Sequence, residues 1–571
     1  MKKNPVFWDF EKLAYPAIFF VGLTLRLLHL GQFSLSDEEA RLALQALSLA
    51  RGEMPSYQNP DGGYLVFTGV LFFIFNATNF LARFVPALLG ALICLMPVGF
   101  RTVLGKKAAL ILSLGLALDG AWLSSARQAG GHSWAVFFFL ISLWTLHSRR
   151  WKLGGVFIGL ALLGGTEIWK GLLPFLTALG IFWWTNRPVL QPAEGETQIK
   201  DHVGKIALWG GGALLVIGTF FLLLPVGLSA FGGGLIEYLR GWGSSAGASI
   251  GLLLGTMVVY QPVALLFGIA GAFYQVKQVQ PLDRFLTVWW ILSLFHLFFY
   301  PAREVLDLIW VSLPLLAMAS RMLVIFFDTR FEQKNLAIIY AAIVFVFLMF
   351  VAQNIARLLS PERLAVNTQP EVIGILAGLV FVAGSIALVA WGWSGRVAGF
   401  GAIGGLLSIL LVYWLSGSIH AAGLGEHPET NPFLRGSLIR EADLLNDTIG
   451  DISELNFLSR NGADIVAAGL NQPALRWAAR EYPYFAFENT LQPQLQSSMV
   501  LTPSALMVEY GEPYRGQDFE WGAKPIWDLM TLQEWLQWAI FKTAPLESNM
   551  IILWARESLF PGNQISTEVK P

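Results

Sequence analysis

Long apolar runs separated by short polar stretches make up most of the first 420 residues of the chain. A membrane-spanning helix needs about 20 mostly apolar residues. The fifth and sixth runs, 153–166 and 170–185, are short, so one broken helix formed by both remains an alternative. We expect an all-α polytopic membrane bundle of about thirteen transmembrane helices, at 14–31, 83–103, 107–124, 132–147, 153–166, 170–185, 206–226, 249–275, 285–300, 305–325, 336–355, 371–392 and 398–418.

The apolar stretch 63–80 decides which loops face the cytoplasm. Cytoplasmic loops of membrane proteins carry an excess of lysine and arginine. If 63–80 does not cross, the N-terminus and basic turns such as Lys106-Lys107 and Arg149-Arg150 fall on the cytoplasmic side; if it crosses, all of these turns move outside. We therefore expect 63–80 to lie in the outer interface. The C-terminal domain is then extracytoplasmic.

The composition changes after about residue 425. Short β-like runs alternate there with two helix-like stretches, which is typical of a small α/β domain. We expect a transmembrane domain over 1–425, with 32–82 as an outer loop, and an extracytoplasmic domain over 426–571. The expected strands and helices lie at 462–468, 473–480 (helix), 484–487, 498–501, 505–508, 532–542 (helix) and 550–554.

Composition supports a polytopic membrane protein. The chain has 571 residues, of which 55% are hydrophobic and only 13% charged, whereas soluble domains have about 25% charged residues. The net charge of −1 gives no reason to expect a nucleic acid partner. The single cysteine, Cys94, excludes a disulfide within the chain.

Three consecutive acids, Asp37, Glu38 and Glu39, follow the first apolar run. Carboxylates at a membrane surface are costly to desolvate, so they need water or a function. One interpretation is a helix start, because Ser36 followed by acids is a typical N-terminal pattern stabilised by the helix dipole. The other is a reactive site. Both interpretations remain open from the residues alone.

An ordered set of blocks resembles the GT-C class of membrane glycosyltransferases, a group that includes protein O-mannosyltransferases and lipid A aminoarabinose transferases (the glycosyltransferase family 39 type). The likeness covers roughly 10–325. The C-terminal domain is an addition. The blocks are Asp37-Glu38-Glu39-Ala40 with Ala43 and Ala46, Asn59-Pro60-Asp61-Gly62-Gly63-Tyr64, Arg83-Phe84-Val85-Pro86, and Gly105-Lys106-Lys107.

The resemblance implies transfer of a sugar from a polyprenyl-phosphate donor to a protein, lipid or glycan acceptor on the outer face. Such a displacement needs a base on the acceptor hydroxyl and stabilisation of the departing phosphate. Asp37 is ranked first as the base because the family base is usually an aspartate. Glu38 is second, although an ungapped match of Ala40 aligns Glu38 and Glu39 with the family pair. The substrate-binding candidates from these blocks include Glu39 and Tyr64.

A further block, Ala126 to Ser133, resembles a family motif of an arginine followed by an acid. Arg127 is kept, but His132 replaces the acid, which in the family helps to bind a metal or the donor phosphate. Arginine matches phosphate oxygens well. Arg127, Arg83 and Arg303 are therefore candidate phosphate ligands, each with an alternative as a headgroup-binding or ion-paired surface arginine.

Three other residues complete the candidate site. Asp119 is an acid inside an expected span, where acids usually face a cavity or a partner. Lys170 lies one turn from Glu167, and we favour an ion pair between them over a place in the donor pocket. No cofactor is certain. A divalent metal is left open, with Asp37, Glu38, Asp119 and His132 as its candidate ligands.

Two other functions stay open. A flippase for lipid-linked saccharides would share the architecture, but transporters often show internal repeats with broken helices, and no such symmetry is visible. A non-catalytic scaffold acting through the C-terminal domain is the other alternative, because His132 departs from the family pattern. Substitution of Asp37 or Glu38 separates an enzyme from a scaffold.

Overall fold

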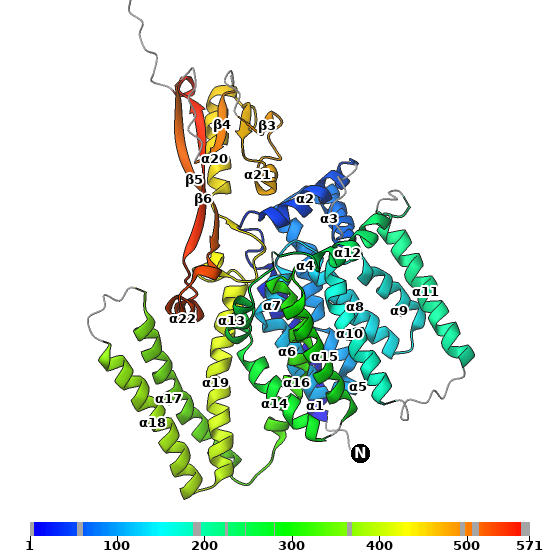
Figure 1. Cartoon of the computed structure of the whole chain (residues 1–571), viewed down its shortest axis with the longest axis vertical. Helices are drawn as coiled ribbons and strands as arrows, with labels where there is room; N and C mark the ends of the chain where they lie inside the picture. The colour runs from blue at the N-terminus through cyan, green and yellow to red at the C-terminus, as the bar shows by residue number, and fades with distance from the viewer. Residues whose placement is uncertain are drawn as a thin grey trace, which may run out of the picture.

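The computed structural model describes a helical bundle with a sheet domain at one end (Figure 1). The N-terminal end of the first helix lies at the opposite end of the bundle from that sheet. Two short helices, α2 and α3, lie at the sheet end, between the bundle and the sheet domain. The described residues are 5–53, 61–186, 196–222, 227–245, 247–278, 280–361, 368–490, 497–504 and 513–560.

The helices of the bundle follow the apolar runs of the sequence closely. The runs end where glycine, proline or charged residues enter, and so do the helices. Their bounds are α1 (Pro5–Leu27), α2 (Asp37–Ala50), α3 (Gly62–Phe75), α4 (Asn79–Ile93), η1 (Met96–Phe100), α5 (Arg101–Leu104), α6 (Lys106–Leu118), α7 (Gly120–Ala126), α8 (His132–His147), α9 (Trp151–Leu162), α10 (Thr166–Thr185), α11 (Glu196–Gly218), α12 (Gly227–Gly241), α13 (Ile250–Tyr260), α14 (Pro262–Gln278), α15 (Pro281–Phe299), η2 (Val305–Asp307), α16 (Leu308–Asp328), α17 (Lys334–Leu359), α18 (Gln369–Gly392) and α19 (Gly395–Ala421).

Within the described residues, six helices are long and apolar enough to cross a membrane, or up to eight if each of two bent pairs is one span. The chain is thus a multi-pass membrane protein, but the expected count of thirteen spans is not confirmed. The expected straight span at 249–275 is instead a bent pair, α13 and α14, which meet at 94° as a broken span or a re-entrant loop. The break falls at Gln261-Pro262, where proline removes a backbone donor and starts the next helix.

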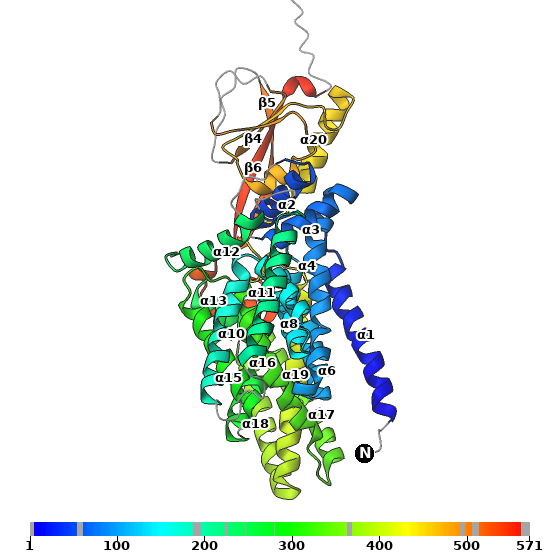
Figure 2. The same ribbon diagram turned by 90° about the vertical axis from the view of Figure 1, so that its right-hand side faces the viewer.

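The stretch expected to lie in the outer interface forms α3, which has 14 residues. At 1.5 Å per residue such a helix is about 21 Å long, well short of the roughly 30 Å hydrocarbon core. It lies beside α2 at the sheet end of the bundle (Figure 2). Its length agrees with a helix that does not cross.

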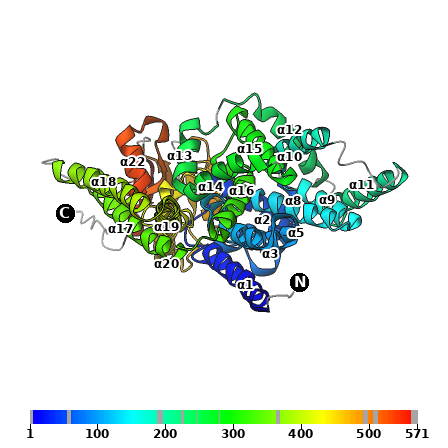
Figure 3. The same ribbon diagram turned by 90° about the horizontal axis from the view of Figure 1, so that it is seen from below.

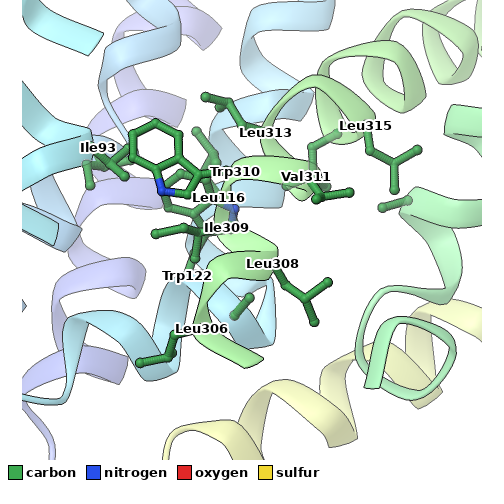
Figure 4. Packing of buried hydrophobic residues seen from close by; sticks show 14 of the residues in the cluster. Ile93, Leu116, Trp122, Leu306, Leu308, Ile309, Trp310, Val311, Leu313 and Leu315 are labelled. Atoms are coloured by element: carbon green, nitrogen blue, oxygen red, sulfur yellow. The ribbon is translucent and has the colours of Figure 1, made fainter. Parts of the chain in front are cut away.

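The centre of the bundle is α16, whose residues from Leu308 to Ser320 are all buried (Figure 4). Its Trp310 packs against α10 so closely that a Cβ on Gly171 would lie 2.1 Å from the indole. The Trp122 Nε1 of α7 donates to Ser312 Oγ at 2.8 Å. Because glycine permits this approach, the N-terminal ends of α10 and α16 lie close together.

Helices at both flanks of the bundle carry exposed apolar side chains. Helices α17 and α18 project on one side and α11 on the other (Figure 3). Apolar surface of this extent is costly in water but not in a bilayer. On α18 the exposed side chains are Val372, Ile373, Leu376, Leu379, Val380, Phe381, Leu388 and Trp391.

The sheet domain has six strands in the order β1-β5-β6-β4-β2-β3. Strand β2 pairs in parallel with β3 and β4, and the other pairs are antiparallel. The elements are β1 (Leu438–Ile439), α20 (Ala442–Phe457), β2 (Ile465–Ala468), α21 (Pro473–Ala478), β3 (Phe485–Glu488), β4 (Met499–Pro503), β5 (Tyr514–Pro525), α22 (Leu532–Phe541) and β6 (Leu546–Arg556).

This topology confirms the expected α/β domain. Four of the five expected strands and both expected helices are present, and the expected strand at 505–508 lies outside the described residues. The long strand β5 and helix α20 were not expected. The first half of strand β5 is mostly exposed, and its sequence lacks an apolar run.

Helix α22 returns from the sheet domain to the bundle. Its Trp538 is fully buried and donates from Nε1 to the Thr430 carbonyl at 3.1 Å. The Tyr413 hydroxyl of α19 donates to the Ala539 carbonyl at 2.6 Å. The sheet domain is therefore anchored to the bundle by α22 as well as by its contact with α2.

Candidate functional site

The three acids of the row Asp37-Glu38-Glu39 have three different environments. Glu39 is buried, and both of its carboxylate oxygens accept from Arg83, at 2.7 Å from Nε and 2.6 Å from Nη2. It also accepts from the backbone N–H groups of Ala129 and Ser36. Burial alone would raise the pKa of Glu39, but Arg83 and these N–H groups hold the pKa below its usual value.

The guanidinium of Arg83 donates hydrogen bonds to groups of the chain itself. Besides Glu39, it donates to the carbonyls of Leu30, Phe33 and Ser34 at 3.2, 2.7 and 3.2 Å. The adjoining cavity, lined partly by Arg83 and Glu39, has a volume of about 60 Å³. Small-molecule sites are typically about 300–1,000 Å³. This geometry favours a structural role for Arg83 and Glu39, as an ion pair that joins α4 to α2. It does not favour a role as substrate ligands.

Asp37 and Glu38 point to different neighbours. The Asp37 Oδ1 accepts from the Ala474 backbone N–H at 3.0 Å, so this carboxylate joins α2 to α21 of the sheet domain. Glu38 pairs with Arg41 at 2.8 Å, and its side chain is 46% exposed. Of the two candidates for a base, Glu38 is bound only to a partly exposed arginine of its own helix, whereas Asp37 is bound to the sheet domain.

The loop from Arg127 to His132 contacts segments that are far apart in the sequence. Arg127 donates from Nη1 to the carbonyls of Leu25, Arg26 and Leu28, which holds the end of α1. Gln128 accepts from the Arg435 N–H at 3.0 Å. The block singled out in the sequence thus binds the end of α1 and the segment after α19, and the Arg127 guanidinium is bound to α1 and the residue that follows it.

His132 belongs to a buried cluster of charged side chains. Its Nε2 lies 3.0 Å from Glu167 Oε2. Lys170 Nζ lies 3.1 Å from Glu167 Oε1 and 2.9 Å from Asp307 Oδ1. All four residues are at least 90% buried. The expected Glu167–Lys170 pair is present, but as one part of a larger network that joins α8, α10 and η2.

Three more charged residues border this cluster. Arg435, from the segment after α19, binds Glu304 from Nε and Nη2 at 3.0 and 3.2 Å. Burial would lower the pKa of Arg435, but Glu304, Glu167, Asp61 and Glu38 raise it. Burial raises the pKa of Asp61 to about 6, opposed by Arg435. We call His132, Glu167, Lys170, Glu304, Asp307, Arg435 and Asp61 the charged chamber.

Several helices begin at the charged chamber. His132 is the first residue of α8, Glu167 the second of α10, and Asp61 immediately precedes α3. The N-terminus of a helix carries about half a positive charge and free N–H groups. These dipoles offset part of the repulsion among the carboxylates. Together with Lys170 and Arg435, they also make the place suitable for an anionic group such as a phosphate.

Gly131 permits the close approach of α3 to this loop. A Cβ at Gly131 would lie 2.8 Å from Asp61 Oδ1 and 2.9 Å from the Gly164 carbonyl. We expect Gly131→Ala to lower the free energy of unfolding by about 1–3 kcal/mol, as overpacking does. Thermal unfolding in detergent measures it. Gly180→Ala on α10 is the control, because a Cβ there meets nothing within 4 Å. Equal melting temperatures for both variants would contradict the expectation.

The other residues expected in the site have partners elsewhere. The Tyr64 hydroxyl donates to the Ala82 carbonyl at 2.9 Å. Asp119 caps α7 by accepting from the Ala121 N–H at 3.1 Å, and Gln261 donates to the same oxygen. Arg303 donates to the carbonyls of Ala248, Phe298 and Tyr300, not to Asp307. Their substrate-binding roles stay predictions that these contacts do not favour.

Of the expected site residues, the structure brings His132 and Lys170 together in the charged chamber. Sequence reasoning did not assign Asp61, Glu304 and Arg435 to a site. Asp61 and Glu304 each stand just before a helix start, which is a signal that sequence alone carries. Arg435 has no such signal, because only the path of the segment after α19 brings it to Glu304.

One set of side chains in the described part of the chain has the arrangement of a metal site. His132, Glu167 and Glu304 each offer one ligand atom, and these atoms lie within 4.8 Å of one another. Of the metal ligands expected from the sequence, only His132 belongs to this set. Asp37 and Asp119 are engaged by backbone N–H groups instead.

Comparison with known proteins identifies the fold. No protein-family model matches the sequence, and no curated protein matches it. The crystal structure of ArnT from Cupriavidus metallidurans bound to undecaprenyl phosphate matches 98% of this chain and 100% of its own, with a TM-score of 0.55 and 13% identity. ArnT from the same organism in the apo state matches 88% of this chain and 94% of its own, with a TM-score of 0.50 and 14% identity. The chain thus has the GT-C-like fold that its sequence resemblance implied.

Proposed function

We propose that the chain is a membrane glycosyltransferase that moves a sugar from a polyprenyl-phosphate donor to an acceptor. The observation that carries this proposal is the charged chamber, which combines buried cations with converging helix N-termini inside a fold similar to ArnT. The similar structure was solved with undecaprenyl phosphate. Fold similarity does not by itself define a reaction, so the proposal depends on the chamber and its neighbours.

In this proposal the departing phosphate is held at the charged chamber. Lys170 and Arg435 are its cationic residues, and each is already oriented by carboxylates, at 2.9 Å from Asp307 and 3.0 Å from Glu304. Preoriented charges stabilise developing negative charge without reorganisation. The N–H groups at the starts of α8 and α10 add to the positive potential.

Glu38 is the proposed general base. It is the member of the acid row that is partly exposed and paired only with Arg41 across the helix surface. Its charge acts on Arg435, so it lies near the chamber. Glu38 takes the proton of the acceptor hydroxyl as that oxygen attacks the anomeric carbon and the bond to the donor phosphate breaks.

The chemistry is proposed to occur on the outer face of the membrane. The acid row, α3 and the sheet domain share one end of the bundle, and the start of α1 lies at the other end (Figure 2). With the basic turns on the cytoplasmic side, that arrangement puts residues 426–571 outside the cell. The contact of Asp37 with Ala474 places the sheet domain beside Glu38, where it can receive an acceptor.

The test is sugar transfer by the purified full-length protein. Polyprenyl phosphates carrying radiolabelled hexose or pentose are incubated with it and a membrane extract. We expect label to pass from the donor lipid to an acceptor. If every donor is bound but none is consumed, the protein is not a transferase. Movement of the intact lipid across a vesicle membrane would then indicate a flippase, and absence of both a scaffold.

A further inference from the structure

We propose that His132, Glu167 and Glu304 bind one divalent transition-metal ion, of the Zn²⁺ or Mn²⁺ type, in the charged chamber. The three residues come from the start of α8, the start of α10 and the turn before η2. The binding itself is argued from the side chains. Only the role of the ion near the donor phosphate rests on the proposed function.

The candidate ligand atoms meet in a small, mostly buried space. One atom from each of His132, Glu167 and Glu304 lies within 4.8 Å of the others, close enough for one ion to bind all three. His132 and Glu167 are 3% exposed, and the Glu304 side chain is 37% exposed. In the structure His132 Nε2 contacts Glu167 Oε2, and Glu304 Oε2 contacts Arg435 Nε, each at 3.0 Å. An imidazole and two carboxylates at this spacing suit a transition-metal ion.

The separation of the first two atoms fits a shared ion. His132 Nε2 and Glu167 Oε2 are 3.0 Å apart. Nitrogen and oxygen ligands lie about 2.0–2.2 Å from Zn²⁺. Two ligands of one ion are then about 3 Å apart at a right angle and about 3.5 Å apart at a tetrahedral angle. The observed distance lies at the short end of this range.

Each glutamate is already oriented by its other oxygen. Glu167 Oε1 accepts from Lys170 Nζ at 3.1 Å and from Thr166 Oγ1 at 3.4 Å. Glu304 Oε1 accepts from Arg435 Nη2 at 3.2 Å. The second oxygen of Glu167 lies 3.0 Å from His132 Nε2, and the second oxygen of Glu304 lies 3.0 Å from Arg435 Nε. Outer contacts of this kind typically fix the ligands of metal sites.

The charge of the chamber also favours a divalent cation. Four carboxyl groups, those of Asp61, Glu167, Glu304 and Asp307, face only two permanent cations, Lys170 and Arg435. With all four ionised, two negative charges remain in a mostly buried space. A divalent ion balances them. Imidazole suits zinc and other transition metals, whereas carboxylates also suit manganese, which defines the class of ion.

The experiment measures metal binding directly. The full-length protein, purified in detergent and stripped with a chelator, is dialysed against Zn²⁺ or Mn²⁺ and its metal content measured by mass spectrometry. We expect one equivalent per chain, and at least about 10-fold weaker binding in His132→Gln and Glu167→Gln. Glu237→Gln is the matched control, because it removes a neighbouring carboxylate that does not belong to the ligand set. It should keep one equivalent.

The opposite results would overturn the proposal. If the native protein holds no stoichiometric metal, or if His132→Gln and Glu237→Gln bind equally, the His132–Glu167 contact is an ion pair. Since Co²⁺ absorption reports its ligands, a spectrum unchanged by His132→Gln would also overturn it. The proposed function fails separately: metal binding without sugar transfer contradicts the transferase, whereas transfer by a metal-free protein contradicts only the metal.

Discussion

Glu39→Gln is expected to destabilise the protein by about 3–5 kcal/mol, the usual cost of removing one partner from a buried ion pair. The substitution leaves the Arg83 guanidinium buried without its carboxylate, at a place where the pair distances are 2.6 and 2.7 Å. It also weakens the acceptor for the Ala129 N–H, which belongs to the loop that carries His132. Thermal unfolding of the purified protein in detergent measures the effect.

The matched control is Glu38→Gln, the same substitution one residue earlier. Glu38 is 46% exposed and pairs with Arg41, and exposed pairs contribute about 0.2–1 kcal/mol. Its melting temperature should stay close to that of the native protein. In the double variant Glu39→Gln/Arg83→Gln, the loss should be smaller than the sum of the two single losses, because the partners are coupled. Equal losses for Glu38→Gln and Glu39→Gln would contradict the assigned role of the pair.

Sugar transfer should fall by about 10²–10⁴-fold in Glu38→Gln, the range that a general base contributes. The amide keeps the size of the side chain but cannot accept the proton of the acceptor hydroxyl. Because the fold should be unaffected, donor binding should persist while turnover is lost. Transfer of label from a polyprenyl-phosphate sugar, measured alongside donor binding, separates the two.

Asp37→Asn is the comparison that decides between the two candidate bases. Its carboxylate accepts from the Ala474 N–H of α21 at 3.0 Å, and an asparagine oxygen can still accept that bond. We therefore expect Asp37→Asn to retain transfer. If Asp37→Asn loses transfer and Glu38→Gln keeps it, Asp37 is the base, as its residue type first indicated. If both variants keep full transfer, neither carboxylate is the base.

One run of three acids thus combines three roles. Glu39 is the capping and pairing residue of α2, with its side chain bound to the Ser36 N–H. Asp37 joins α2 to the sheet domain, and Glu38 is the proposed base. The capping box of Ser36 and Glu39 confirms the helix-start interpretation, whereas the reactive-site interpretation stays a prediction that now rests on Glu38.

The sequence by itself predicted the helices of the bundle well. Apolar runs, helix-start residues and basic turns act over a few residues, so they can be recognised locally. The run at 132–147 coincides with α8, and 371–392 with α18 (Gln369–Gly392). At Gln261-Pro262 the helix breaks within one long apolar run. The proline is a local signal for this break, but the length of the run favoured the prediction of a single span.

The sheet domain was predicted where its strands carry apolar runs. Strand β2 is buried throughout, and its apolar sequence identified it. The first half of strand β5 is mostly exposed and includes Gly516, so β5 lacks such a run. It is a strand because β6 pairs with it along nearly its whole length. Pairing between strands far apart in sequence is a tertiary effect that local patterns do not encode.

The site is what only the tertiary structure decided. The sequence indicated which residues are chemically capable, but not which of them meet. Lys170 binds Asp307, 137 residues away, and Arg435 binds Glu304, 131 residues away. Arg83, Arg127 and Arg303 had the right chemistry for phosphate, yet their guanidinium groups are bound to chain carbonyls. Local periodicity sets where a helix starts and ends, whereas the packing of several helix ends sets which charges share a buried space.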